Sequence, residues 1–293
     1  MIIDFHTHIF PPQIRENRSD YLKCDPCFAE LYSSPKAKLA TAEELIASMD
    51  EAGIDASVVL NIGWITQKLC VKTNDYILEA VSRYPHRLIG FCAIQPKSGE
   101  EAIAELERCA QGGAKGIGEL RTDIQEIDLR DVEMLAPFSE IASKYNLILL
   151  IHASEPVGHH YPGKGNITPN ILYQFISNFP KLVIVCAHWG GGLPFYALMP
   201  EVASALTNTF FDTAASPLLY RPQIFKHATE IVGADKILFG SDYPLMSQGR
   251  VTRDIELAEL PQEVGKMILG GNAQRILGWN KSAPSSPLNC PGK

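Results

Sequence analysis

Short apolar runs rich in β-branched residues alternate along the chain with amphipathic stretches. This alternation is typical of repeated βα units that build a parallel sheet. Eight runs are predicted to be strands, at residues 2–8, 55–61, 87–94, 115–120, 147–152, 182–188, 208–213 and 236–241. Eight βα units in about 280 residues predict a (β/α)8 (TIM) barrel. An open doubly wound sheet is the alternative, but the first turn lacks the glycine-rich fingerprint typical of that fold.

One long segment interrupts the alternation after the first predicted strand. Residues 10–40 are rich in Pro, Ser and polar side chains and are predicted to be a long loop. On a barrel such a loop lies over the mouth at the C-terminal ends of the strands, where it could act as a lid. We expect residues 1–281 to form one barrel domain and residues 282–293 to form a loosely ordered tail.

The composition is that of an ordinary folded protein, with 46% apolar and 20% charged residues. A net charge of −7 argues against a nucleic-acid backbone as the main partner. The longest apolar stretches, such as Leu147 to Ile151, are too short to span a bilayer. Because strand-like residues begin at Met1 without a basic leader, we expect no secretory signal and a cytoplasmic protein.

The seven cysteines are scattered and odd in number, which favours reduced thiols over a disulfide framework. Cys24 and Cys27 form a lone CxxC motif. A structural zinc site would require a second ligand pair at comparable spacing, and the sequence offers none.

Polar residues follow a period of two in the first predicted strand. Side chains at i and i+2 share one strand face, so Asp4, His6 and His8 are expected to align there. Two imidazoles so placed can hold one cation at about 2.0–2.1 Å. Asp4, one layer below, is a candidate to orient the histidines. The His6-Thr7-His8 pattern alone carries little weight, because such pairs also arise by chance.

Four other predicted strands end in a residue that can bind a metal or move a proton. These residues are Glu119, His152, His188 and Asp242. In a barrel the strand ends converge on one mouth, where enzymes of this fold place their chemistry. Each residue alone has an ordinary structural explanation as a cap, a core histidine or a surface glutamate. Six such residues at five strand ends predict a metal site.

Together these motifs resemble the amidohydrolase superfamily, and more narrowly its amidohydrolase-related branch, which includes aminocarboxymuconate-semialdehyde decarboxylase-like enzymes. The resemblance spans nearly the whole chain in the family's order and implies a (β/α)8 barrel. The matching segments are Asp4-Phe-His-Thr-His8, His152, Ala187-His-Trp-Gly-Gly191, Gly240-Ser-Asp-Tyr-Pro244 and Gly271-Asn-Ala-Gln-Arg275.

By this resemblance His6, His8, His152 and Asp242 would bind one divalent metal, most often zinc, with manganese or iron as alternatives. His188 would be a catalytic residue or a ligand of a second metal. Such a ligand set leaves a position open for water, whose pKa the cation lowers to about 7. Asp242 could take a proton from that water and pass it to a leaving group. His188 could orient the substrate or stabilise an oxyanion.

Glu119 leaves the number of metals open. Gly116-Ile-Gly-Glu119 resembles a motif of TatD-type deoxyribonucleases, in which a strand-4 glutamate takes part in a two-metal site. The single-metal decarboxylases do not generally rely on a glutamate there. We expect one metal, with Glu119 as a metal ligand or a close partner of the ligands, and a second metal stays chemically feasible. An ion pair between Glu119 and Arg121 is the alternative.

Four residues near the predicted strand ends are candidates for substrate contact. Arg121 could bind a substrate carboxylate bidentately or form a salt bridge within its loop. Trp189 and Tyr243 could form aromatic walls of a pocket, although core packing would explain them equally well. His159, in the loop after the fifth predicted strand, could touch the substrate or simply be solvated.

The sequence favours metal-activated hydrolysis of an ester, lactone or amide bond in a small molecule, because a carboxylate such as Glu119 helps to generate hydroxide. The alternative is non-oxidative decarboxylation of an aromatic or unsaturated carboxylic acid, which would use the same residues. A catalytically inactive barrel would have lost a strand-end ligand, and a TatD-like nuclease would need basic clusters that this chain lacks. Enzymes of this kind are often homodimers, which is our expectation for the oligomeric state.

Overall fold

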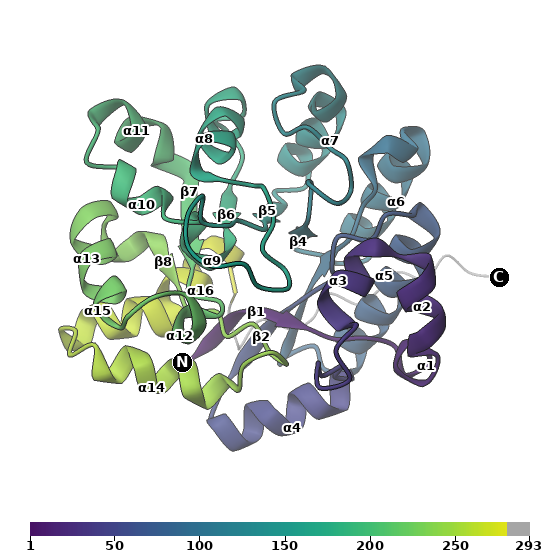
Figure 1. The fold of residues 1–293 in the computed structure, drawn as a ribbon, viewed down its shortest axis with the longest axis horizontal. Helices are drawn as coiled ribbons and strands as arrows, with labels where there is room; N and C mark the ends of the chain where they lie inside the picture. The colour runs from purple at the N-terminus through teal and green to yellow at the C-terminus, as the bar shows by residue number, and fades with distance from the viewer. Residues whose placement is uncertain (280–293) are drawn as a thin grey trace.

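The computed structural model describes residues 1–279. Eight parallel strands follow one another in the order β1 to β8, with helices around them (Figure 1). The predicted (β/α)8 barrel is confirmed, because each strand lies within one of the predicted runs, and the tail expected at 282–293 lies outside the described residues. The strands are β1 Ile3–His8, β2 Ala56–Leu60, β3 Leu88–Cys92, β4 Gly116–Leu120, β5 Ile148–Ile151, β6 Ile184–Cys186, β7 Thr209–Asp212 and β8 Ile237–Leu238.

Backbone hydrogen bonds between β1 and the last strand region bring the two edges of the sheet together. The N–H of Phe5 donates to the carbonyl of Phe239 at 2.7 Å, and the N–H of His8 donates to the carbonyl of Tyr243 at 2.7 Å. A parallel bridge also pairs Thr7 with Tyr243. The sheet is therefore nearly closed, and the C-terminal ends of β1 and β8 meet at one mouth.

Alternate residues of a strand face two different apolar cores, as the period of two requires. In β2, Ala56, Val58 and Leu60 belong to the cluster inside the barrel. Val59, between them, belongs to the larger cluster that lies between the strands and the helices. Trp279 packs against the inner cluster. The strands are thus buried on both faces, which is why they appear in the sequence as continuous apolar runs.

The outer layer consists of the helices that follow the strands. Among residues 1–279, no helix combines the length and the apolar character needed to cross a membrane. The longer helices are α4 Ala42–Ala52, α5 Gln67–Arg83, α6 Glu100–Gln111, α7 Val132–Lys144, α8 Pro169–Asn178, α13 Gln223–Val232 and α14 Gln248–Leu257. The shorter segments are α9 Ala187–Gly190, α10 Leu193–Tyr196, α11 Pro200–Ala205, α12 Ser216–Leu219, α15 Gln262–Lys266, α16 Asn272–Leu277, η1 Pro96–Ser98, η2 Leu206–Asn208, η3 Ala234–Lys236 and η4 Met267–Gly271.

The long segment expected after β1 is present, but helices occupy much of it. They are α1 Pro12–Glu16, α2 Arg18–Cys24 and α3 Pro26–Tyr32, drawn in dark purple in Figure 1. A proline begins both α1 and α3, where its fixed φ favours a helix start. The Phe28 ring of α3 stacks on Trp64, with centroids 5.7 Å apart. This contact fastens the segment to the loop after β2, a tertiary interaction that a polar, proline-rich composition does not reveal.

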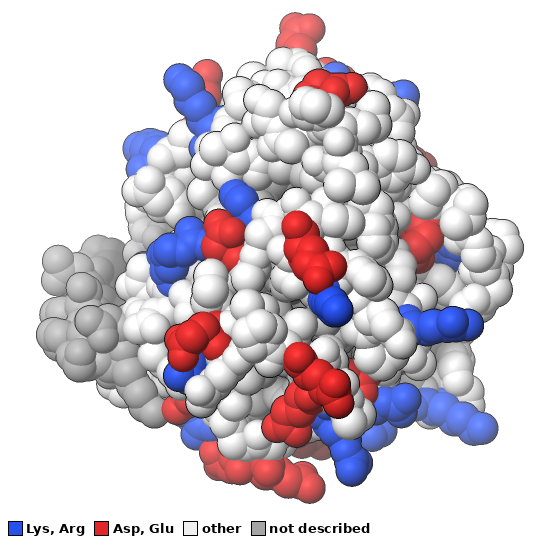
Figure 2. All heavy atoms as spheres, turned by 90° about the vertical axis from the view of Figure 1, so that its left-hand side faces the viewer, with Lys and Arg blue, Asp and Glu red and all other residues white. Residues whose placement is uncertain are grey.

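The molecular surface carries charges of both signs. On the face shown in Figure 2, Lys and Arg side chains are interspersed with Asp and Glu. Exposed ion pairs elsewhere on the described chain include Lys97–Glu126 and Lys144–Glu107. With a net charge of −7, that face offers no broad basic surface for a phosphate backbone.

Candidate metal centre

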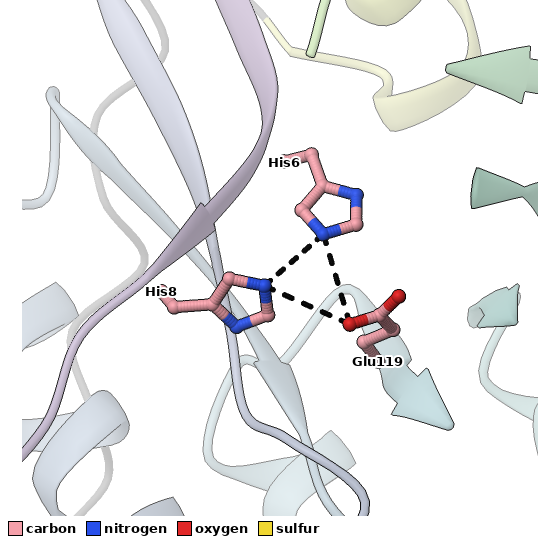
Figure 3. Close-up of side chains that lie close together, drawn as sticks. All are labelled: His6, His8 and Glu119. Atoms are coloured by element: carbon pink, nitrogen blue, oxygen red, sulfur yellow. Dashed lines mark hydrogen bonds and ion pairs between the residues drawn. The ribbon is translucent and has the colours of Figure 1, made fainter. Parts of the chain in front are cut away.

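His6 and His8 extend from the C-terminal end of β1 with their rings directed toward each other (Figure 3). Both side chains are buried, and their Nε2 atoms are 3.1 Å apart. Two nitrogen ligands about 2.0–2.1 Å from a tetrahedral metal would stand about 3.3 Å apart. The pair therefore has the spacing that a shared cation requires.

Asp4 is fully buried, and among the described residues no hydrogen bond or ion pair joins its carboxylate to the imidazole of His6 or His8. It accepts hydrogen bonds from Ser241, from Gln248 of α14 and from the backbone N–H of His6. A register shift in β1 between Asp4 and Thr7 adds one residue and changes the alternation that the sequence predicted. The expected alignment of Asp4 with the two histidines on one strand face is therefore wrong, and Asp4 contacts His6 through the backbone N–H of His6.

Glu119, near the end of β4, lies against both histidines. Its Oε2 atom is 3.8 Å from His6 Nε2 and 3.7 Å from His8 Nε2 (Figure 3). Gly118 permits this placement, because a Cβ at that position would stand 2.6 Å from the carbonyl oxygen of Leu150. The three side chains form one group whose ligand atoms could hold a metal ion.

The other carboxylate oxygen of Glu119 faces a second pair of histidines. Oε1 is 2.8 Å from Nδ1 of His152, which follows β5, and 3.3 Å from Nε2 of His188, which follows β6. Glu119, His152 and His188 form a second group that could hold a metal. His152 is therefore grouped with His188, and it shares Glu119 with the pair in β1.

Asp242, which follows β8, also approaches the histidines of β1. Its Oδ1 atom is 3.5 Å from His8 Nε2 and 3.8 Å from His6 Nε2. The backbone N–H of Asp242 donates to the carbonyl of His6 at 2.9 Å, which fixes the residue to β1. The structure thus brings Asp242, Glu119, His6 and His8 around one position.

Asp212, the last residue of β7, is a site residue that the sequence reasoning missed. Its side chain is fully buried, and Oδ2 is 2.8 Å from His6 Nδ1. The signal was present, because the predicted strand 208–213 carries this acidic residue near its end, just as 115–120 carries Glu119. A carboxylate only accepts hydrogen bonds, so His6 Nδ1 carries a hydrogen in this contact.

Burial and the histidines act in opposite directions on the two carboxylates that face His6. Burial raises the pKa of Glu119, but the charges of His152 and His6 outweigh it and hold that pKa well below its usual range. Burial likewise raises the pKa of Asp242, and the hydrogen bond with His8 and the charge of His6 lower it to about 2. Both groups are therefore ionised at neutral pH, which is the state that binds a cation.

The same carboxylates raise the pKa of two histidines. Burial lowers the pKa of His6, but the charges of Asp212 and Glu119 outweigh it and raise the pKa to about 10. For His188, burial is outweighed by the hydrogen bond with Glu119 and the charge of Asp242, and the pKa is raised to about 9. The cluster of anions therefore favours positive charge at this mouth, as protons or as a metal ion.

Arg121 lies just beyond β4 and is buried with part of its guanidinium group unpaired. Its Nε is 3.3 Å from Asp123 Oδ1, and its Nη2 is 3.2 Å from Glu30 Oε1 in α3. Nη1 has no hydrogen-bond partner among the described residues. Burial, and after it the charge of Arg121, lowers the pKa of His152. Arg121 thus forms the expected salt bridge within its loop and keeps one donor free.

The other predicted substrate residues lie in different surroundings. Trp189 is fully buried, donates its indole N–H to Ser216 and packs edge-on against Phe225. Its position is that of a core residue and not of an open pocket wall. Tyr243 is half-buried, and His159 is exposed in the loop after β5. Substrate contact by Tyr243 and His159 stays a prediction.

Buried histidines and carboxylates at the mouth of a (β/α)8 barrel define a class of metal-dependent enzymes. The sequence model of the amidohydrolase family matches residues 3–279, and the chain belongs to this family. The resemblance first indicated by the strand-end motifs is thereby confirmed.

Two similar proteins are named as decarboxylases. A gamma-resorcylate decarboxylase from Polaromonas sp. is 24% identical over 282 residues, which covers 80% of this chain and 86% of that protein. A 2-amino-3-carboxymuconate-6-semialdehyde decarboxylase from Dictyostelium discoideum is 23% identical over an alignment of 332 positions, gaps included. The alignment covers 94% of this chain and 91% of that protein.

Solved structures share the fold at low sequence identity. The 5-carboxyvanillate decarboxylase from Sphingomonas paucimobilis has a TM-score of 0.80 at 19% identity, covering 96% of this chain and 99% of that chain. The enzyme of the same name from Novosphingobium aromaticivorans, with bound manganese, has a TM-score of 0.78 at 19% identity, covering 95% and 97%. A probable 2-pyrone-4,6-dicarboxylic acid hydrolase from Acinetobacter baumannii has a TM-score of 0.66 at 17% identity, covering 95% and 99%.

Proposed function

We propose that this chain catalyses the non-oxidative decarboxylation of a small aromatic or unsaturated carboxylic acid. The two similar proteins from Polaromonas sp. and Dictyostelium discoideum, which match most of the chain, are named as decarboxylases. Two similar barrels carry the same kind of name. Glu119 taken alone favours hydrolysis, but these relatives favour decarboxylation instead.

The observation that carries the carboxylate substrate of this proposal is the free donor of Arg121. The side chain is 1% exposed, and its Nη1 has no hydrogen-bond partner among the described residues. Leaving a buried charged donor unpaired costs about 1–3 kcal/mol or more. A substrate carboxylate would satisfy it through a charge-assisted hydrogen bond. Arg121 lies two residues beyond Glu119, and its charge contributes, after burial, to lowering the pKa of His152, so we infer that a carboxylate bound here would lie close to the metal centre.

We assign one divalent cation to His6, His8, Glu119 and Asp242. The 3.1 Å separation of the two imidazole nitrogens and the two ionised carboxylates fit such an ion. Mixed nitrogen and oxygen ligands suit both manganese and zinc, so both are candidates. When bound, the cation would polarise substrate oxygen atoms and stabilise the charge that develops on them.

His188 is the proposed proton donor. Decarboxylation breaks the bond to the carboxyl carbon and leaves the electron pair on the substrate carbon, which must then take a proton as CO2 departs. In the metal-free chain burial is outweighed by Glu119 and Asp242, which raise the pKa of His188 to about 9. Glu119 Oε1 faces His188 Nε2 at 3.3 Å while Oε2 faces the histidines of β1, so the ring is suited to holding a proton beside the proposed cation. Its Nδ1 donates to the carbonyl of Ala214 at 3.1 Å, which orients the ring so that Nε2 faces Glu119.

Release of CO2 from hydroxylated benzoic acids tests the proposal. Protein loaded with manganese or zinc is expected to release CO2, and chelator-treated protein is not. His188→Gln should lose most of this activity, because glutamine cannot donate an acidic proton. His227→Gln is the matched control, since His227 is exposed and pairs with Glu230. Loaded protein that releases no CO2 from any such acid, yet hydrolyses lactones, would rule out the decarboxylase assignment.

Metal-assisted hydrolysis of a lactone or ester is the second candidate. Glu119 presents one oxygen to each pair of histidines, and a carboxylate so placed is suited to generating hydroxide from water. The similar barrel described as a probable 2-pyrone-4,6-dicarboxylic acid hydrolase supports this candidate. Its named substrate also carries carboxylates, so Arg121 would serve either reaction. Acid production from lactones without CO2 release distinguishes the two.

A further inference from the structure

We propose that Asp212 is a positioning residue that sets the orientation of His6 and fixes the backbone of His188. Its Oδ2 atom lies 2.8 Å from His6 Nδ1, and its Oδ1 atom accepts from the backbone N–H of His188 at 2.9 Å. The same oxygen accepts from the N–H of Ala214 at 3.0 Å. One buried carboxylate thus serves three donors on three segments of the chain. The inference rests on the metal site of the proposed function, but not on the reaction.

The first role concerns the two ring nitrogens of His6. Because Asp212 only accepts hydrogen bonds, it keeps the hydrogen on His6 Nδ1 and directs Nε2 toward His8 and Glu119. A carboxylate in this position orients a metal-binding imidazole and raises its basicity. His8 differs, since its Nδ1 has no hydrogen-bond partner among the described residues. Of the two histidines in β1, only His6 therefore has its ring orientation fixed by a hydrogen bond at Nδ1 among the described residues.

The second role concerns the turn that carries His188. His188 has a φ of +53° and Trp189 a φ of +58°, in a left-handed region that side chains with a Cβ rarely adopt. The hydrogen bond from the His188 N–H to Asp212 holds the start of this turn. Asp212 therefore couples the placement of a histidine on β1 to that of a histidine after β6.

Asp4 provides a matched comparison. Both aspartates are fully buried, and both accept hydrogen bonds close to His6. Asp4 contacts the backbone of His6 together with Ser241 and Gln248, whereas Asp212 contacts the ring. Neutralising either carboxylate removes a buried charge, but the change at Asp212 alone removes the partner of the imidazole.

Asp212→Asn and Asp4→Asn distinguish the positioning role from general burial. An amide has a single acceptor oxygen, so the Asp212→Asn side chain cannot serve both the ring of His6 and the N–H groups of His188 and Ala214. The dissociation constant for Mn2+ is expected to rise about 10- to 100-fold in Asp212→Asn. In Asp4→Asn the dissociation constant for Mn2+ should stay within about threefold of the wild-type value. That change is well below the effect of removing a group that hydrogen-bonds to a metal-binding imidazole. Circular dichroism of both variants tests that they fold.

A second measurement needs no variant. In zinc-loaded protein labelled with 15N-histidine, His6 is expected to show a hydrogen on Nδ1 that exchanges slowly with water. A His6 ring with no hydrogen on Nδ1, or unchanged Mn2+ affinity in folded Asp212→Asn, would overturn the role of Asp212. An equal loss of affinity in Asp4→Asn would do the same. The metal-loaded protein could show the weaker Mn2+ binding in Asp212→Asn and the hydrogen on His6 Nδ1 and still release no CO2. That result would contradict the decarboxylase proposal but not the role of Asp212.

Discussion

Glu119 and His152 are joined by a 2.8 Å contact between Oε1 and Nδ1, which leaves Oε2 as the oxygen that faces His6 and His8. A carboxylate only accepts, so His152 Nδ1 carries the hydrogen in this contact. A metal bound by His152 through that nitrogen would have to displace the hydrogen. A metal between His6 and His8 needs no such change. This contact favours one metal per chain over two.

Replacing Glu119 by glutamine should weaken the binding of that one metal. The wild-type protein is expected to bind one equivalent of Mn2+ or Zn2+, and Glu119→Gln to bind it at least about tenfold more weakly, because an anionic ligand is lost. Calorimetric titration measures both numbers. Glu105→Gln is the control, since Glu105 is equally buried but pairs with Asn74 and Arg108. Two equivalents in the wild type, falling to one in Glu119→Gln, would replace the one-metal assignment.

Removing His6 should cost more than removing any residue behind it. His6→Ala deletes a ligand atom, so we expect at least about a 100-fold loss of metal affinity, the upper end of what a partner behind a ligand contributes. Metal content of the purified protein, followed by titration, measures the loss. His227→Ala is the control, because His227 is exposed and lies in a surface pair with Glu230. A His6→Ala variant that retains its full metal content would contradict the central assignment.

The strands could be predicted from the sequence because a barrel strand is buried on both faces. Such a strand appears in the sequence as a continuous apolar run, which is easy to recognise. The run 147–152 is an example, and β5 lies inside it. Helices α1 to α3 could not be predicted with the same rule, because their burial depends on distant partners. Phe28 packs on Trp64, a residue from the next βα unit. Composition alone does not encode such a contact.

The candidate site was largely predictable because parallel strands end at one mouth. That rule found Glu119, His152 and Asp242 from the residue type at each strand end. The separate rule that residues i and i+2 share a strand face failed for Asp4, because a one-residue shift in β1 changes which side chains share a face. Inspection of the strand ends could also have found Asp212, because β7 ends in this acidic residue. Which histidine each carboxylate faces depends on side-chain geometry that no spacing in the sequence specifies.

Replacing Arg121 by lysine should weaken substrate binding more than turnover. Lysine keeps the charge beside Asp123 and Glu30 but lacks the planar fork that supplies the free Nη1 donor. Loss of a hydrogen bond to a charged group costs about 1.5–3 kcal/mol, which corresponds to a rise in KM of roughly 10- to 100-fold for a carboxylate substrate. Arg130→Lys is the control, since Arg130 is exposed and pairs with Asp128. An unchanged KM in Arg121→Lys would remove Arg121 from the substrate site.

Removal of the metal should make the stability of the protein fall as the pH rises from about 7 to about 10. In the folded chain the pKa of His6 is raised to about 10 and that of His188 to about 9, above the ordinary value of 6.5. A group with a raised pKa contributes stability that is complete below its ordinary pKa and is lost as the pH passes its folded value. The thermal midpoint of chelator-treated protein is therefore expected to decrease across this range.

A bound cation should reverse this dependence at His6. A histidine must be neutral to bind a metal, so metal binding releases a proton and becomes stronger as the pH rises. The difference in thermal midpoint between metal-loaded and chelator-treated protein is therefore expected to widen with pH. In chelator-treated His6→Gln the slope should be shallower, and in His227→Gln it should match the wild type. A midpoint that stays constant or rises with pH after chelation would mean that Asp212 and Glu119 do not hold positive charge on His6.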